Sequence, residues 1–90
     1  MRERQAANLV FFYDAGHGWL RIYKGVLEAL GIAKDISRYS YIKDEMVYLE
    51  EDCDAGKLLK ALKESGREYN IAKVDQGHNS PIRNYRSYVA

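Results

Sequence analysis

Aromatic side chains with cations among them recur along segments of the sequence that have the pattern of strands. The aromatic members are Trp19, Tyr23, Tyr39, Tyr41 and Tyr48, and the cations are Arg21 and Lys43. Such a set can stack unpaired bases, each contributing ~1–3 kcal/mol. It can equally form the centre of a protein–protein interface, because Trp, Tyr and Arg combine large contact area with polar groups. Tyr also favours strands for packing reasons alone, so three interpretations stay open.

A run of acidic residues follows the second of these aromatic segments. Residues 44–54 contain six acidic side chains and no basic one. Four of them, Glu50, Glu51, Asp52 and Asp54, could pair with an Arg-rich loop of a partner, or they could simply lie at a helix start, where the dipole favours carboxylates. Cys53 lies among them, and like charge raises the pKa of a thiol, so we expect a small buried residue rather than a nucleophile.

The C-terminal segment interleaves arginines with tyrosines. Arg83 and Arg86 alternate with Tyr85 and Tyr88 after Pro81. The tyrosines could dock on the sheet, or the arginines could form a small anion-binding patch.

Two histidines raise the question of a metal site. Asp14-Ala15-Gly16-His17-Gly18 is similar to a segment of the zinc-dependent N-acetylmuramoyl amidases, in which the His of such a segment binds the metal. That family has a further Glu and His as ligands and about twice this length, and His78 is the one other histidine here. A tight turn in which the glycines adopt positive φ is the favoured interpretation.

Hydrophobic periodicity predicts the order ββ-α-ββ-α-β. The predicted strands cover Asn8–Tyr13, Trp19–Tyr23, Arg38–Lys43, Met46–Glu50 and Tyr69–Val74, and the predicted helices cover Lys24–Leu30 and Ala55–Ser65. Gly31 is expected to end the first helix, and Asp54 to cap the second. This pattern predicts a single α+β domain over residues 1–90, with an antiparallel sheet of about five strands and both helices on one face. Residues 1–7 and 81–90 are expected to be tails, flexible or docked.

Alternation along the strands divides the side chains between two faces. Leu20 and Ile22 are expected to face the helices, while Trp19, Arg21 and Tyr23 face the other way. The second face is therefore expected to stay open, which would also give a homodimer a surface to form on.

Composition limits the classes of protein that remain. The chain has 90 residues, 47% hydrophobic and 30% charged, with one proline. This argues against disorder, and no apolar run reaches the ~18 residues of a membrane span. One cysteine closes no disulfide within the chain, so a soluble, cytoplasmic protein is expected. One cysteine and two histidines do not make a zinc site of the usual spacing, so no metal or cofactor is expected. A net charge of +1 gives no general attraction to nucleic acid or membranes.

Five segments together resemble a group of small hypothetical proteins of bacteriophages and bacterial mobile elements. They are Gly16-His17-Gly18-Trp19-Leu20, Leu30-Gly31-Ile32, Tyr39-Ser40-Tyr41, the stretch from Tyr48 to Ala55 (YLEEDCDA), and Ile82-Arg83-Asn84-Tyr85. The stretch from Tyr48 to Ala55 is the most specific. The resemblance implies no catalytic residue. It implies a protein that binds host machinery, as inhibitors of CRISPR and of other defence systems do, and this is an argument from context alone.

The first hypothesis is therefore a binding protein, without catalytic residues, that blocks a host protein or defence complex. Its predicted partner-binding residues are Trp19, Arg21, Tyr39, Tyr41, Tyr48, Glu50, Glu51, Asp52 and Asp54. The alternative is a single-stranded nucleic-acid binder that adds Tyr23, Lys43, Arg83, Tyr85 and Arg86. A small His17-dependent hydrolase or metal enzyme is the third hypothesis.

Overall fold

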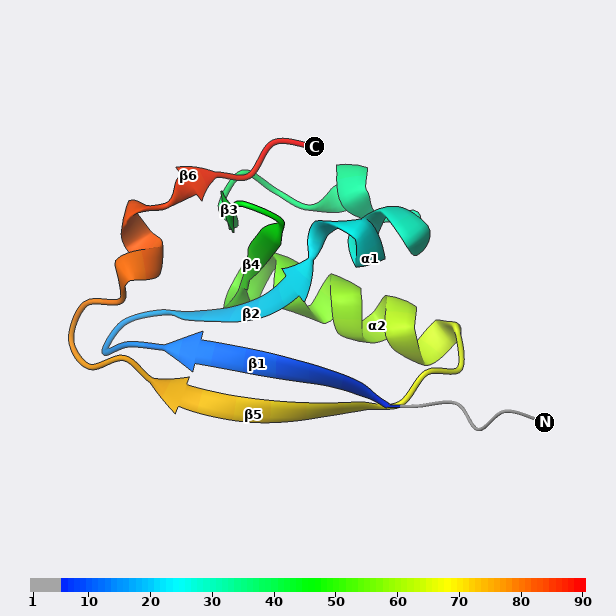
Figure 1. Cartoon of the computed structure of the whole chain (residues 1–90), viewed down its shortest axis with the longest axis horizontal. Coiled ribbons are helices and arrows are strands. Elements are labelled where there is room, and N and C mark those ends of the chain that lie inside the picture. Colours follow the sequence, from blue (N-terminus) through cyan, green and yellow to red (C-terminus); the bar gives the residue numbers. More distant parts are fainter. Residues whose placement is uncertain (1–5) are drawn as a thin grey trace.

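The computed structural model describes residues 6–90 as a mixed sheet with helices packed against it (Figure 1). The six strands are β1 (Ala7–Tyr13), β2 (Gly18–Tyr23), β3 (Tyr41–Lys43), β4 (Met46–Glu50), β5 (Tyr69–Asp75) and β6 (Arg86–Ser87), in the spatial order β5-β1-β2-β4-β3-β6. The helices are α1 (Lys24–Ala29) and α2 (Gly56–Glu64), with a π-helical turn at Glu51–Ala55 and 3-10 turns at Ala33–Asp35 and Pro81–Asn84. The predicted α+β class is confirmed.

One strand pair departs from the predicted antiparallel sheet. Strand β5 runs parallel to β1, with Leu9 beside Ile71. The reason lies in the connection. Strand β4 is antiparallel to β2, which is antiparallel to β1, so β4 and β1 run the same way. Because the α2 crossover carries the chain back to the end of the sheet where β4 began, β5 must run in that direction too.

The helix-side face of the sheet holds the main core, as the alternation predicts. Leu20 and Ile22 of β2 are buried there together with Leu27 of α1 and with Leu58 and Leu62 of α2. Helix α1 ends as predicted, because Gly31 adopts a φ of 74° and the Ile32 amide then donates to the Leu27 carbonyl at 3.0 Å.

The opposite face is partly covered by the C-terminal segment, so the prediction of an open aromatic face was wrong for two of its rings. Trp19 is 2% exposed and Tyr48 is 9% exposed, and both pack with Ile82 of the 3-10 turn. Tyr85 packs on the same cluster, 5.2 Å from Tyr48 between ring centroids. Apolar rings gain more by being covered by the chain's own tail than by facing water.

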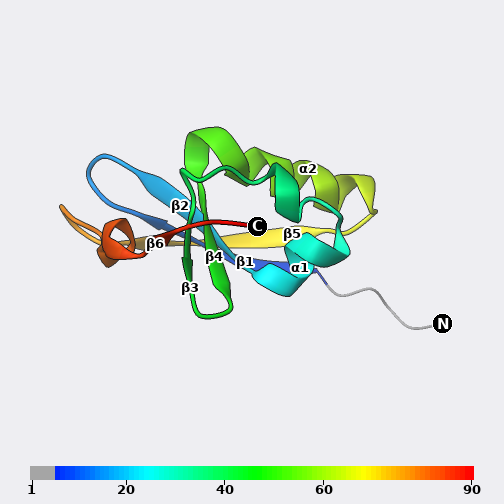
Figure 2. The same cartoon turned by 90° about the horizontal axis from the view of Figure 1, so that it is seen from above.

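The C-terminal segment is therefore docked, which is one of the two states predicted for residues 81–90. Strand β6 pairs with β3, and the Tyr88 amide donates to the Ser40 carbonyl at 2.8 Å. Figure 2 shows this segment crossing β3 and β4 on its way to the C-terminus. In the other predicted tail, residues 1–5 lie outside the described residues, and Ala7 already belongs to β1.

Candidate functional site

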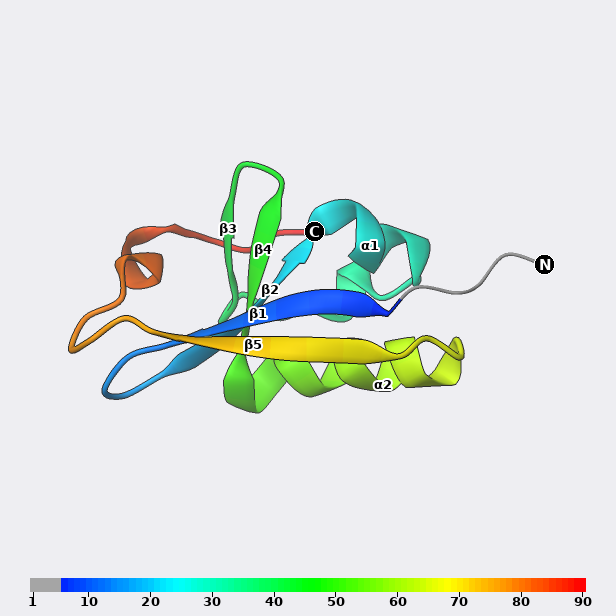
Figure 3. The same ribbon diagram turned by 60° about the horizontal axis from the view of Figure 1, so that its bottom comes forward.

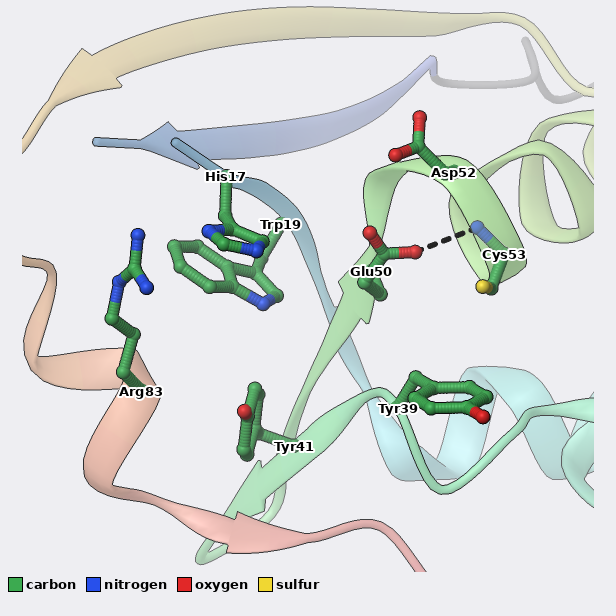
Figure 4. Close-up of a pocket in the computed structure, with 8 residues that line it drawn as sticks. All are labelled: His17, Trp19, Tyr39, Tyr41, Glu50, Asp52, Cys53 and Arg83. Carbon is green, nitrogen blue, oxygen red and sulfur yellow. Dashed lines mark hydrogen bonds between the residues drawn. The ribbon is translucent and has the colours of Figure 1, made fainter. Parts of the chain in front are cut away.

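A cavity of about 280 Å³ lies where the β1–β2 turn, the start of β3, the end of β4 and the C-terminal 3-10 turn meet (Figure 4). We call it the aromatic–acidic pocket. Its lining residues are His17, Trp19, Tyr39, Tyr41, Glu50, Asp52, Cys53 and Arg83. The antiparallel register explains part of this grouping, because Trp19 and Glu50 are directly paired across β2 and β4 and so project from the same face.

Rings form one wall of the pocket. The His17 ring stacks on Trp19 with centroids 6.0 Å apart and an interplanar angle of 18°, and Tyr41 meets Trp19 edge-on at 6.3 Å. Tyr39 stands at the rim, 61% exposed. Within residues 6–90 the buried Nε1–H of Trp19 has no hydrogen-bond partner, and Figure 4 shows this nitrogen on the edge of the indole that faces Tyr41 and Glu50. A buried donor without an acceptor costs free energy, so it marks a place where a ligand acceptor would be favoured.

The turn that carries His17 is held by Asp14. One carboxylate oxygen of Asp14 accepts from the amides of Gly16 at 3.0 Å and His17 at 2.9 Å. Both oxygens also accept from Arg83, which donates from Nε at 2.6 Å and from Nη2 at 2.9 Å. The Arg83 hydrogen bonds lower the pKa of Asp14 most, and the amides of Ser80, Gly16 and His17 lower it further against the opposing effect of burial.

The predicted tight turn is confirmed, but the reason given for its glycines was wrong. Gly16 and Gly18 are not among the glycines with positive φ. Close approach explains Gly18 instead, because a Cβ there would lie 2.2 Å from the Phe11 ring and 3.1 Å from the Glu51 carboxylate. Within residues 6–90 no cluster of three or more His, Cys, Asp or Glu side chains could hold a metal ion.

Carboxylates line the other side of the pocket. Glu50 precedes the π-helical turn and accepts from the Cys53 amide at 2.7 Å, so Glu50, not Asp54, caps this helix. Glu51 and Asp52 are exposed. Asp54 is buried, which contradicts its prediction as a partner-binding residue. It faces inward to accept hydrogen bonds from Ser37 and Ser40, which lie 17 and 14 positions away in the sequence.

Cys53 is exposed in the pocket, so the prediction that it is buried was wrong. Cys53 lies in the π-helical turn Glu51–Ala55, whose buried residues are Asp54 and Ala55 instead. Its pKa is raised, first by a hydrogen bond to Glu50 and then by burial and by the charges of Glu50, Asp54 and Asp52. The predicted direction is thus correct, and the pocket does not activate this thiol as a nucleophile.

The residues predicted to bind nucleic acid do not lie in one site. Lys43 lies over the Tyr85 ring at 4.9 Å, and these two line a separate hollow with Arg86 and Asp44. Tyr23 is 59% exposed at the end of β2, while Arg83 is held by Asp14 in the aromatic–acidic pocket. Arg21, a partner-binding candidate, packs over the Phe12 ring at 5.1 Å instead of reaching the pocket.

The pocket therefore gathers five of the nine predicted partner-binding residues and adds three others. The five are Trp19, Tyr39, Tyr41, Glu50 and Asp52. The additions are His17, Cys53 and Arg83. From the sequence, these were discussed as a metal ligand, a buried residue and a nucleic-acid contact, respectively. The one sequence signal for their proximity is the acid–base complementarity of Asp14 and Arg83, separated by 69 positions.

Stability is expected to fall in acid because two carboxyls hold lowered pKa values. Burial alone raises the pKa of Asp54, but hydrogen bonds from Ser37, Ser40 and Lys57 outweigh this effect and lower it. The hydrogen bonds from Arg83 lower the pKa of Asp14. Both values lie below the ordinary 3.8. The stability they contribute is complete above about pH 4 and is lost as the pH falls through the lowered values.

Urea unfolding at a series of pH values measures this effect. Asp14→Asn is less stable near neutral pH and loses less further stability between about pH 4 and pH 2 than the wild type, because one of the two titrations is gone. A wild type equally stable at the two ends of that range would contradict the assignment.

No family model, no curated protein and no solved structure matches this chain. None of the helices within residues 6–90 has the length and apolar character that a membrane crossing needs.

Proposed function

We propose that this protein is a binding module that captures a partner protein by holding one of the partner's basic side chains in the aromatic–acidic pocket. One observation carries the proposal, namely the meeting of Trp19, Tyr39 and Tyr41 with the carboxylates of Glu50 and Asp52 around one cavity. The rings of Tyr39 and Tyr41 attract a cation through their quadrupoles, and carboxylates add charge-assisted hydrogen bonds. The two kinds of group together select a cation. Trp19, which is 2% exposed and already has Arg83 6.0 Å from its ring centroid, contributes its Nε1–H.

The charge balance of the pocket supports a cationic ligand. Among residues 6–90, Arg83 is the one arginine or lysine that lines it, and its charge is matched by the Asp14 carboxylate at 2.6 Å. Glu50 and Asp52 then remain as the charges of the lining that have no ion-pair partner within the described part of the chain, and both are negative. A phosphate would be repelled at this position, which favours a protein partner over a nucleic acid.

The size of the pocket supports a single side chain as the ligand. A volume of about 280 Å³ is at the lower limit of the roughly 300–1,000 Å³ typical of small-molecule sites. The Trp19 Nε1–H adds a donor for which a peptide carbonyl next to the basic residue is a suitable acceptor. The resemblance to small bacteriophage proteins directs the search for the partner to host proteins, defence complexes included.

Titration of the tryptophan fluorescence tests the proposal, because Trp19 is the only Trp of the chain. The probes are the N-acetyl methylamides of lysine and arginine, with those of norleucine and glutamate as neutral and acidic controls. The basic probes are expected to bind and to slow alkylation of Cys53, the only cysteine, whereas the two controls do neither. Equal responses to lysine and norleucine probes would refute a cation site.

A matched pair of variants assigns the binding to the pocket. Asp52→Lys places a positive charge in the lining and is expected to weaken binding of the lysine probe about tenfold or more. Asp44→Lys makes the same change in an exposed residue outside the pocket and is expected to leave binding nearly unchanged. Equal weakening by the two variants would show a general charge effect and no specific site.

Capture from host lysate distinguishes the proposed function from the nucleic-acid alternative. The hollow that Lys43, Tyr85 and Arg86 share is what supports that alternative. A protein partner is retained by the wild type after nuclease treatment and is lost with Asp52→Lys. Capture that disappears on nuclease treatment, with no effect of Asp52→Lys, supports the alternative instead.

A further inference from the structure

Strand β5 forms an edge of the sheet that the described part of the chain leaves unpaired (Figure 3). All seven of its residues are exposed, so both faces of the strand are partly open to solvent. Its large apolar side chains Tyr69, Ile71 and Val74 are 37%, 39% and 40% exposed. Proteins usually protect long apolar edges by charge, proline or bulges, and here Lys73 is the one basic residue of the strand.

The backbone groups that face outward can be identified from the two ends of the β1–β5 ladder. The Ala7 amide donates to the Glu68 carbonyl at 2.9 Å, and the Gln76 amide donates to the Tyr13 carbonyl at 2.7 Å. Backbone polar groups of a strand point alternately to its two sides, so the even-numbered residues of β5 bond to β1. The amides and carbonyls of Tyr69, Ile71, Lys73 and Asp75 therefore point to the free edge.

We propose that a second copy of this chain occupies this edge, with the two β5 strands antiparallel around a two-fold axis at Ile71. The proposal rests on the complementarity of the strand with itself in this register, independently of the pocket. Ile71 faces its own copy, Tyr69 faces Lys73, and Arg67 faces Asp75. Each of these pairs is favourable, being apolar, cation–π and ionic respectively.

The alternative registers lack this complementarity. A shift that centres the axis on Lys73 places the two lysines opposite each other, which is destabilising. An axis at Ala72 places Lys73 opposite Ile71 and leaves Arg67 without Asp75. The pairs Ile71–Ile71 and Tyr69–Lys73 consist of odd-numbered residues of β5, whose outward backbone groups can exchange two hydrogen bonds. The resulting dimer has one continuous sheet, an isologous interface and both aromatic–acidic pockets free.

Sedimentation equilibrium with charge-swapped variants tests the interface. The wild type is expected to show twice the 10.4 kDa mass of one chain. Arg67→Glu and Asp75→Lys each place like charges opposite each other twice in the dimer, and each is expected to raise its dissociation constant about tenfold or more. The double variant Arg67→Glu/Asp75→Lys restores opposite charges and recovers dimerisation. Failure of this rescue, or a monomeric wild type at every concentration, would overturn the proposal.

A cysteine scan tests the register, with Cys53→Ser in every variant. Ile71→Cys is expected to form an intermolecular disulfide on mild oxidation, because facing residues of a hydrogen-bonded antiparallel pair have Cα atoms about 5.5 Å apart. Ala72→Cys and Lys73→Cys are the matched controls and are expected to cross-link far more slowly. Faster cross-linking of either control, or none at Ile71→Cys, would overturn the proposed register. Retained binding of the lysine probe by the Arg67→Glu and Asp75→Lys variants, both outside the pocket lining, shows that the pocket and the interface are separate.

Discussion

Replacing Asp54 by Ala is expected to lower the free energy of unfolding by about 2–4 kcal/mol, because it leaves the buried Ser40 hydroxyl and the half-buried Ser37 donors without their acceptor. The Asp54 carboxylate is fully buried and accepts from the Ser37 amide, the Ser37 and Ser40 hydroxyls and the Lys57 ammonium group. A domain of this size is typically stable by only about 5–15 kcal/mol in total. The substitution therefore removes a large part of the stability.

The effect is expected to reach the aromatic–acidic pocket through Ser40. The Ser40 hydroxyl donates to Asp54 at 2.6 Å and accepts from the Glu50 amide at 2.9 Å, so it links the acidic turn to the end of β4. Glu50 in turn caps the turn that presents Asp52 and Cys53. Loss of the Asp54 carboxylate frees this chain of hydrogen bonds, so binding of a basic probe should weaken along with stability.

Urea unfolding measures the change, with Asp52→Ala as a matched control in the same turn. Asp52 is exposed, and its truncation is expected to change stability by no more than about 0.5 kcal/mol. Asp54→Asn keeps one acceptor oxygen, so its loss of stability should lie between the losses of Asp54→Ala and Asp52→Ala. Equal stability of the Asp54→Ala and Asp52→Ala variants would show that the Asp54 network contributes nothing net.

The elements could be predicted because they follow from local patterns. Alternation along Trp19–Tyr23 correctly separates the core side chains from the aromatic ones, and Gly31 ends its helix with the positive φ that glycine permits. The composition of the pocket was partly predictable for the same reason. Side chains on alternate residues of neighbouring strands share a face, which brings Trp19 and Glu50 together.

What could not be predicted depends on contacts between distant residues. The sequence around Asp54 has the form of a helix cap, and only the approach of Ser37 and Ser40, separated from it by 17 and 14 positions, makes burial of its charge favourable. The requirement for glycine at position 18 likewise depends on the position of the Phe11 ring in the folded chain. The parallel β1–β5 pair follows from the path of the α2 crossover, which no strand pattern encodes.

The sequence did not decide whether the C-terminal segment is docked on the sheet or free, for a related reason. Its interleaved arginines and tyrosines fit a docked tail and a free basic patch equally well. The difference is made by Ile82 and Tyr88, which are 1% and 2% exposed on the two faces of the sheet. A segment anchored on both faces gains enough apolar burial to offset the entropy of ordering it.

Tyr88→Ala is therefore expected to destabilise the domain by about 3 kcal/mol or more, the usual effect of truncating a buried aromatic residue. The Tyr88 ring belongs to the main core, and its hydroxyl donates to the Ala33 carbonyl at 2.7 Å. Tyr88→Phe keeps the ring and should lose only about 1 kcal/mol, the contribution of that hydrogen bond. Val89→Ala, at a neighbour that is 75% exposed, is the control.

The same variant separates a local cavity from release of the whole C-terminal segment. If the segment is released, Ile82 no longer covers Trp19 and Arg83 leaves Asp14, so acrylamide quenches the Trp19 fluorescence more strongly and the lysine probe binds more weakly. We expect both changes in Tyr88→Ala and neither in Tyr88→Phe, because anchoring needs the ring. A destabilised Tyr88→Ala variant with wild-type quenching and binding would show that Ile82 and Arg83 hold the segment without Tyr88.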